Sequence, residues 1–375
     1  MMKRFLILLF SLGLYLLPSS HFGWGNGAGL LLAQQPLADR ALQDLKQNTK
    51  FGGYIIGQAT VKDQRGNDVK ADGTLRLVRV SASGNVLDFG YMLQLQLNGT
   101  STDKKGNEPR IVDAWVEWQR YDFLRVKFGQ FKRAFTFENP AHPWNIGAGN
   151  YSQLTLRLAG FNDRVGEHSS NGRDFGLQLQ GDFFPVGTDR HHLFHYQIGA
   201  YNGQGINRGD CNTRKDLIGG IAVRPIKDLQ VGVFGWDGDF VKDGLKVSRT
   251  RWAIGALYDG CITAHAEYAH SVGRKISTNT AGTPVISGAD RADAWYALVG
   301  VPITDKIKVW GKYDVYRDTR EWDSARSLYI LTADYNFHKN LKLQLNYTRV
   351  NDRLVNNTGG DGDYNQVDLQ LYVRF

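Results

Sequence analysis

The sequence predicts an all-β protein, a transmembrane antiparallel β-barrel of 16 strands with long external loops and short periplasmic turns. Three observations support this. Apolar residues recur at every second position along most of the chain, which is typical of strands with one apolar face. The connections between these segments are alternately short and long. The chain also ends on such a segment, "VDLQLYVRF", and the composition suits many strands and tight turns, with 43 Gly and only 9 Pro among 375 residues.

The first 33 residues have the features of a signal peptide. A basic pair, Lys3 and Arg4, precedes an apolar run over 5–17. That run is shorter than the about 20 residues that a transmembrane helix needs. We expect a signal peptide over 1–33 and a short periplasmic segment over 34–50, with leucines at helical spacing in 36–47. The barrel then takes up 51–375.

The predicted strands are defined by the alternation. In "VLDFGYMLQLQL", for example, Phe89, Tyr91 and Leu93 share one face, while Gln94 and Gln96 lie on the other. The sixteen segments are 51–61, 74–82, 86–97, 111–120, 123–131, 172–183, 192–201, 216–225, 228–237, 247–258, 261–271, 291–301, 307–317, 327–337, 341–350 and 365–375.

The connections favour a barrel over a soluble sandwich. Seven are short, beginning with "SGN" at 83–85, and eight are long and polar. The long ones are 62–73, 98–110, 132–171, 202–215, 238–246, 272–290, 318–326 and 351–364. Tight turns on one rim and long loops on the other are typical of outer-membrane barrels. Closure into a barrel also satisfies every backbone polar group, which lipid cannot do.

The final strand is predicted to face lipid with every second residue. Its apolar row is Val367, Leu369, Leu371, Val373 and Phe375. The row resembles the C-terminal signal of outer-membrane proteins that the barrel-assembly machinery reads. The alternative is an ordinary edge strand of a soluble sheet. We expect a protein of the bacterial outer membrane that contacts outer-membrane lipid and is exported through the periplasm.

Charge and motifs narrow the function. The formal net charge of +8 favours anionic partners, and no nucleic-acid-binding motif is present. His191, His192 and His195 lie at a predicted periplasmic turn without a carboxylate spaced to complete a metal shell, so no metal site is expected. No GxSxG motif occurs. We therefore expect no enzyme and no cofactor. Cys211 and Cys261 fall on opposite rims, too far apart for a disulfide.

The longest connection is the third external loop, over 132–171. Loops of this length are usually functional, and we expect it to fold inward and narrow the lumen. Pores select by the charged groups at their narrowest point, and guanidinium groups match the oxygens of phosphate or carboxylate. Candidate anion-binding residues in or next to the loop are Lys132, Arg133, Arg157, Arg164 and Arg173. The alternative is that they are ordinary loop charges, partly paired with Glu138, Asp163 and Glu167.

Strand parity adds cations to the wall of the lumen. The inward faces carry acids as well as bases, with the bases in excess. The candidate wall cations are Arg125, Lys127, Arg249, Arg251, Lys308 and Lys312.

Three stretches resemble the phosphate-selective porin O and P family, which are trimeric sixteen-stranded anion channels. "TLRLVRVSASG" (74–84) is similar to the family's arginine-rich second strand, "FLRVKFGQFKRAFTFENP" (123–140) to the segment leading into its inward loop, and "GRDFGLQLQG" (172–181) to a strand start. The resemblance implies that Arg76 and Arg79 contribute to the constriction and that the chain forms a homotrimer. The family's tandem arginine appears here as Arg76-Leu77, so a general preference for anions is implied more strongly than specificity for phosphate.

The leading hypothesis is a water-filled diffusion channel that prefers phosphate or similar small anions. A barrel-borne receptor or adhesin would act through its external loops, with the third loop outside the lumen. An outer-membrane lipase is the third alternative.

Overall fold

The structure is a computed structural model that describes residues 37–64, 69–98 and 109–375. The predicted signal peptide, 1–33, lies outside the described residues. The chain divides into two compact units, Met1–Arg40 and Ala41–Phe375, and the second contains the barrel. None of the helices among the described residues is long and apolar enough to cross a membrane.

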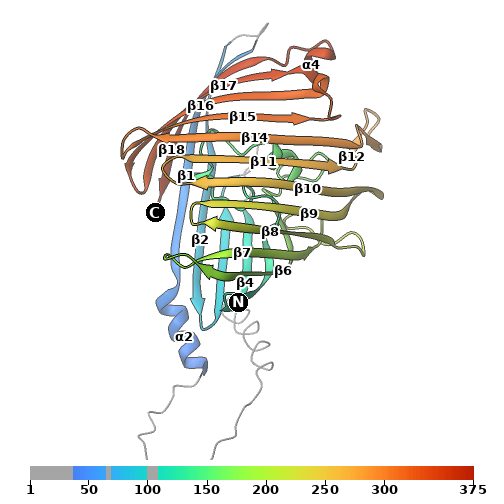
Figure 1. The fold of residues 1–375 in the computed structure, drawn as a ribbon. Coiled ribbons are helices and arrows are strands. Elements are labelled where there is room, and N and C mark those ends of the chain that lie inside the picture. The colour runs from blue at the N-terminus through green and yellow to red at the C-terminus, as the bar shows by residue number, and fades with distance from the viewer. Residues whose placement is uncertain (1–36, 65–68, 99–108) are drawn as a thin grey trace, which may run out of the picture. The chain divides into compact units, whose positions relative to one another are not determined.

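Sixteen antiparallel strands form a closed barrel in chain order, and β1 pairs with β18 to close it (Figure 1). A separate two-stranded hairpin, β12 (Lys275–Thr278) and β13 (Pro284–Ser287), lies in an external loop. The barrel strands are β1 (Lys50–Gln64), β2 (Lys70–Val86), β3 (Phe89–Gln96), β4 (Arg110–Tyr121), β5 (Leu124–Lys132), β6 (Arg173–Val186), β7 (His191–Tyr201), β8 (Asp216–Ile226), β9 (Leu229–Lys242), β10 (Leu245–Asp259), β11 (Thr263–Val272), β14 (Arg291–Pro302), β15 (Ile307–Arg317), β16 (Ala325–His338), β17 (Leu341–Asp352) and β18 (Tyr364–Arg374).

Helices occupy the N-terminal segment and the loops. The predicted helix over 36–47 corresponds to α2 (Leu37–Asn48). The others are η2 (Pro143–Asn145), α3 (Gln153–Leu158), η3 (Trp322–Ser324) and α4 (Arg353–Asn357).

The predicted architecture of sixteen strands is confirmed, but three predicted connections are wrong. The fifth external connection is the two-residue turn Asp243–Gly244, with φ of 51° and 78°, because an Asp-Gly pair suits a tight hairpin. The strands β1 and β2 extend beyond the prediction, so only 65–69 separate them. The turn after β2 is at Leu87–Asp88, with Val86 opposite Phe89, rather than at 83–85.

The last strand shows the predicted division into two faces. Val367, Leu369 and Leu371 are 40–44% exposed on the outer surface. Between them, Asp368 and Gln370 are buried inside, where Asp368 accepts hydrogen bonds from Gln58 and Thr60 of β1. Because the barrel closes at this seam, the terminal strand is an interior member of the sheet.

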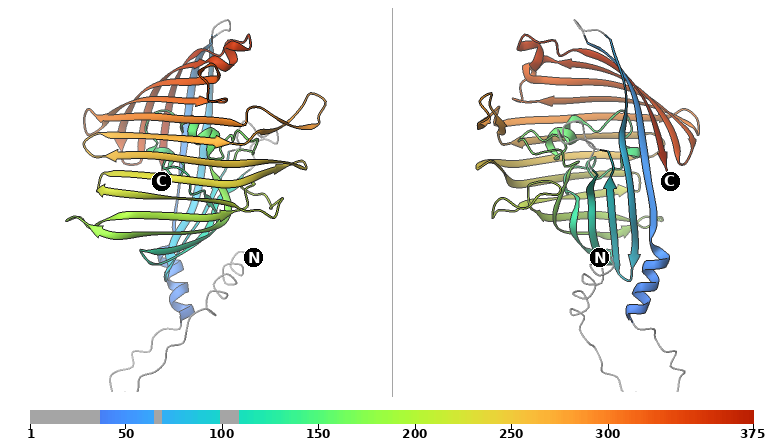
Figure 2. Two further views of the ribbon diagram at one scale, coloured as in Figure 1. Left: turned by 45° about the vertical axis from the view of Figure 1, so that its right-hand side comes forward. Right: turned by 180° about the vertical axis from the view of Figure 1, so that it is seen from behind.

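The lumen contains an apolar core as well as polar side chains. The segment 133–172, which we call the inward loop, follows β5 and lies inside the ring of strands as the green segment in Figure 2. Leu154 and Leu158 of α3 are fully buried against wall residues that include Trp236 and Tyr316. The loop is therefore packed against the wall over a broad area.

Candidate functional site: the inward loop and the basic cluster

The inward loop crosses the lumen and contacts opposite parts of the wall. It leaves the wall at β5, and α3 packs against β11, β14 and β15. Beyond this contact, the Gly149 N–H donates to Asn346 on β17 at 3.0 Å, and the rings of His142 and Tyr54 on β1 lie 4.6 Å apart. The loop therefore occupies part of the cross-section of the lumen.

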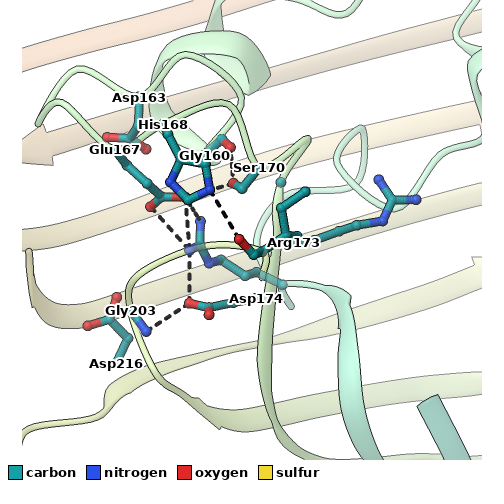
Figure 3. A network of polar contacts seen from close by, with 12 residues as sticks. Gly160, Asp163, Glu167, His168, Ser170, Arg173, Asp174, Gly203 and Asp216 are labelled. Carbon is teal, nitrogen blue, oxygen red and sulfur yellow. Dashed lines mark hydrogen bonds and ion pairs between the residues drawn. The ribbon is translucent and has the colours of Figure 1, made fainter. Parts of the chain in front are cut away.

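A buried network of ion pairs fixes the two ends of the inward loop (Figure 3). Arg133 donates to Glu167 at 3.0 Å and to Asp174 at 2.8 Å, and all three side chains are completely buried. Arg249 on β10 also pairs with Glu167, and it contacts Asp216 at 2.6 Å. Glu167 therefore joins the C-terminal part of the loop to its first residue and to β10.

A second ion pair ties the loop to the next inward position of β10. Arg251 donates to both oxygens of Asp163, at 2.7 Å and 2.6 Å. Burial by itself raises the pKa of Asp163, but the Arg251 guanidinium holds that pKa below its usual range. Three guanidinium groups, those of Arg133, Arg249 and Arg251, lie within 5.0 Å of the ring centroid of Trp236. Since these cations are matched by buried carboxylates, they anchor the loop.

Two other candidate anion-binding residues, Arg173 and Arg164, also donate their hydrogen bonds to groups of the protein. Arg173 makes a bidentate pair with Asp113 on β4, at 3.0 Å and 2.7 Å. Arg164 donates to the backbone carbonyls of Gly273 and, at 2.7 Å, Ala289 at the base of the external hairpin.

The predicted wall cations face inward, as strand parity predicts, but they have partners. Arg125 pairs with Asp182 at 2.5 Å, and Lys127 lies 3.3 Å from Glu117. Lys308 donates to the Thr263 hydroxyl at 2.7 Å. Lys312 contacts Glu138 of the inward loop at 3.5 Å.

A different group of cations contacts neutral partners. Arg79 on β2, 3% exposed, donates to the Tyr54 hydroxyl at 2.9 Å and to Gln96 at 3.0 Å. Lys132, at the end of β5, donates to the carbonyls of Asn139 and Ala141 and to the Tyr151 hydroxyl at 3.2 Å. Among the described residues, neither cation forms a salt bridge with a carboxylate.

These two side chains belong to one group between the loop and β2–β6, which we call the basic cluster: Arg79, Arg110, Lys132 and Arg173. Asn171 links Arg79 and Arg110, because its side-chain oxygen accepts from them at 3.2 Å and 2.9 Å in the orientation that satisfies all three. Lys132 lies within electrostatic range of Arg79 and Arg173. The carboxylate of Asp113 is paired with Arg173.

Two further predicted cations lie outside the basic cluster, Arg76 on β2 and Arg157 on α3. Arg76 donates to Gln370 at 2.9 Å and to Asn150 at the loop. Arg157 on α3 is exposed, with its guanidinium 5.8 Å from the ring centroid of Tyr316. No salt bridge to a carboxylate is formed by either residue within the part of the chain that the structure describes.

Sequence reasoning missed Arg110, Tyr54, Tyr151 and His142. Arg110 begins β4 and faces inward opposite Gln96, but it fell within a predicted loop. Tyr54 lies opposite Arg79 in the β1–β2 register. Strand parity predicts that Tyr54 faces inward. Its contact with Arg79, however, can be predicted only when the register of β1 and β2 is known.

His142 responds to the charge of the basic cluster. Partial burial and the nearby cations Lys132, Arg79 and Arg374 lower its pKa to about 4. Its Nδ1 accepts a hydrogen bond from the Trp144 N–H at 3.1 Å, as the neutral ring can.

We predict that His142 adds no charge to the lumen between pH 7 and pH 5. Because its folded-state pKa lies below the unfolded value, the ring becomes protonated only as the pH falls through about 4. A His142→Gln variant should match the wild type in reversal potential at pH 7 and 5, and should lack the wild type's added anion preference near pH 3.5. A difference already present at pH 5.5 contradicts the assignment.

Comparison with known proteins agrees with this architecture. Residues 54–191, from β1 to the start of β7, match the family model of phosphate-selective porin O and P. No curated protein matches the sequence significantly.

Solved structures share the fold at low sequence identity. An anion-selective porin from Comamonas acidovorans has a TM-score of 0.64 at 15% identity, with 87% of this chain and 99% of that chain covered. The outer membrane channel DcaP of Acinetobacter baumannii gives 0.60 at 12%, covering 87% and 97%. Salmonella typhi OmpF, in complex with daunomycin, gives 0.65 at 13%, covering 88% and 98%. The chain therefore has the closed sixteen-stranded fold of outer-membrane porins, and its residues 54–191 match the family model of phosphate-selective porin O and P.

Proposed function

We propose that the protein is a diffusion channel of the outer membrane that prefers small anions, phosphate or similar solutes, and that the basic cluster is its selectivity site. The observation that carries the proposal is that, within the described part of the chain, Arg79 and Lys132 contact only neutral groups. In contrast, buried carboxylates pair with Arg133, Arg173, Arg249 and Arg251. A cation without a counter-ion attracts a permeating anion at low cost.

The chemistry of the cluster suits oxyanions. The guanidinium of Arg79 has donors in a fixed plane that match the oxygens of a phosphate or carboxylate. The ammonium of Lys132 adds a point charge, and Tyr151 and Tyr54 add hydroxyl groups beside the two cations. Arg76 on β2 and Arg157 on α3 of the inward loop add further positive charge.

The position of the inward loop favours a channel over a receptor or adhesin. A receptor acting through its external loops has no need for a 40-residue segment packed in the lumen, whereas a selective pore needs a constriction. One similar structure, OmpT of Vibrio cholerae, is described in a trimer form. We propose a homotrimer for this chain as well.

The solute can be tested by competition. Chloride current through the purified channel should fall when phosphate is added, because phosphate occupies the basic cluster for longer. A Lys132→Met variant should require a higher phosphate concentration for the same reduction. Equal inhibition of both proteins contradicts a phosphate site at Lys132.

We also propose that the terminal strand acts as the barrel-assembly signal through Val367, Leu369, Leu371, Val373 and Phe375. Phe375 is 66% exposed, and its backbone N–H and C=O both pair with Gly53 at 3.0 Å, so its ring is available at the barrel seam. A Phe375→Ala variant should yield much less heat-modifiable folded barrel in the outer membrane. Phe337→Ala, which removes another exposed ring, should assemble normally. Equal yields contradict the signal.

A further inference from the structure

The inward loop contacts a row of inward-facing residues that runs across five neighbouring strands. Gly232, Gly255, Glu267, Tyr296 and Asp314 are successive partners in the register of β9, β10, β11, β14 and β15. We call this row the loop seat. It is a continuous row of the wall, although its members are far apart in the sequence.

Glu267 is the polar centre of the loop seat. Its two carboxylate oxygens accept the backbone N–H groups of Phe137 at 2.6 Å and Glu138 at 2.8 Å, and the Tyr296 hydroxyl at 2.9 Å. Two successive N–H groups directed at one anion form a compact binding site. Glu267 is 3% exposed, so its charge is directed at the loop backbone.

The glycines of the loop seat make room for Phe137. A Cβ atom at Gly232 would lie 2.7 Å from the Phe137 ring, and one at Gly255 would lie 2.9 Å from it. The same ring contacts Phe234 edge-on, with centroids 4.9 Å apart. The wall therefore has a hollow at the position where the loop first reaches it.

The conformation of the loop at this point needs external support. Thr136, just before Phe137, has φ of 64°, which is unfavourable for a β-branched residue. Further along the loop, both oxygens of Asp314 accept the Gln153 N–H at the start of α3, at 2.9 Å and 3.1 Å. Wall carboxylates thus hold both halves of the loop.

We propose that the loop seat sets the width of the channel, with Glu267 as its main positioning residue. The carboxylates of Glu267 and Asp314 bind backbone N–H groups of the inward loop and do not select the solute by charge. The inference rests on the proposed channel function, but it concerns pore width, which neutral solutes report independently of charge.

The first test compares two Glu→Gln variants. The Glu267→Gln side chain has one acceptor oxygen, so its amide NH₂ must face a backbone N–H. We expect the loop to loosen, the exclusion limit for neutral polyethylene glycols to shift to larger polymers, and open-channel noise to rise. The control is Glu117→Gln, which removes an equal charge from a wall residue bonded to Lys127 and Gln180. It should change the reversal potential and leave the exclusion limit unchanged.

The second test changes no charge. Gly255→Ala adds a methyl group that would lie 2.8 Å from Cγ of Glu267 and 2.9 Å from the Phe137 ring, and it should shift the exclusion limit in the same direction as Glu267→Gln. Its control is Gly235→Ala, on the outer face of β9, where a Cβ atom meets nothing within 4 Å. Heat-modifiable migration in detergent gels confirms that each barrel is folded before it is measured.

The outcomes separate the two proposals. An unchanged exclusion limit in folded Glu267→Gln and Gly255→Ala overturns the loop seat, whatever the ion preference. A Glu267→Gln channel with increased anion preference and an unchanged limit also overturns it, because Glu267 is then a charge filter. If the limits shift as expected in a wild-type channel that prefers cations, the loop seat stands and the proposed anion preference fails.

Discussion

Replacement of Arg133 by methionine should lower the free energy of unfolding by about 3–5 kcal/mol, the cost typical of removing one partner from a buried ion pair. Arg133 is matched by Glu167 and Asp174, and all three side chains are completely buried. Glu167 retains Arg249, but Asp174 loses its guanidinium partner and keeps the Gly203 N–H. The resulting uncompensated charge is the source of the destabilisation.

Denaturant unfolding followed by tryptophan fluorescence in lipid vesicles measures the effect. Arg157→Met is the control, because Arg157 is exposed and should change stability by no more than about 0.5 kcal/mol. Adding Asp174→Asn to Arg133→Met should recover part of the loss, since it removes the unpaired charge. If Arg133→Met is as stable as Arg157→Met, the buried network does not anchor the inward loop.

Replacement of Lys132 by methionine, or of Arg79 by glutamine, should reduce the anion-to-cation permeability ratio about tenfold. A unit charge about 4 Å from an ion contributes about 4 kcal/mol at an effective dielectric constant of 20. Water retained by the ion and salt screening, with a Debye length of about 8 Å, reduce this. If about 1.4 kcal/mol of this interaction energy remains, the permeability ratio changes tenfold.

Reversal potentials in a salt gradient provide the measurement. The control is Lys339→Gln, which removes an equal charge from an exposed residue at a periplasmic turn. It should leave the ratio nearly unchanged. If Lys132→Met and Arg79→Gln behave like Lys339→Gln, the basic cluster does not select the permeating ion.

The fold was predictable because a membrane imposes simple rules on strands. Alternation over "VDLQLYVRF" and its counterparts identified the strands, since lipid and water face opposite sides of one sheet. The errors at Asp243–Gly244 and at Leu87–Asp88 arose where polar residues continue a strand beyond the apolar band. There the alternation weakens while the ladder of hydrogen bonds continues.

The site was less predictable than the fold. Parity places Arg249 and Arg251 in the lumen, but parity does not reveal that Glu167 and Asp163, more than 80 residues earlier, neutralise them. The charge that a permeating ion meets is that of the cations without a carboxylate partner. Which cations these are depends on how the inward loop folds, for which the sequence carries no periodic signal. Arg79 and Lys132 are distinguished from Arg133 only by their partners.

The most direct test of the proposed anion preference is the zero-current potential of the wild-type protein across a planar bilayer with a potassium chloride gradient. We expect a potential with the sign of chloride preference, and this preference should be weaker in Lys132→Met. A potential with the sign of potassium preference contradicts it.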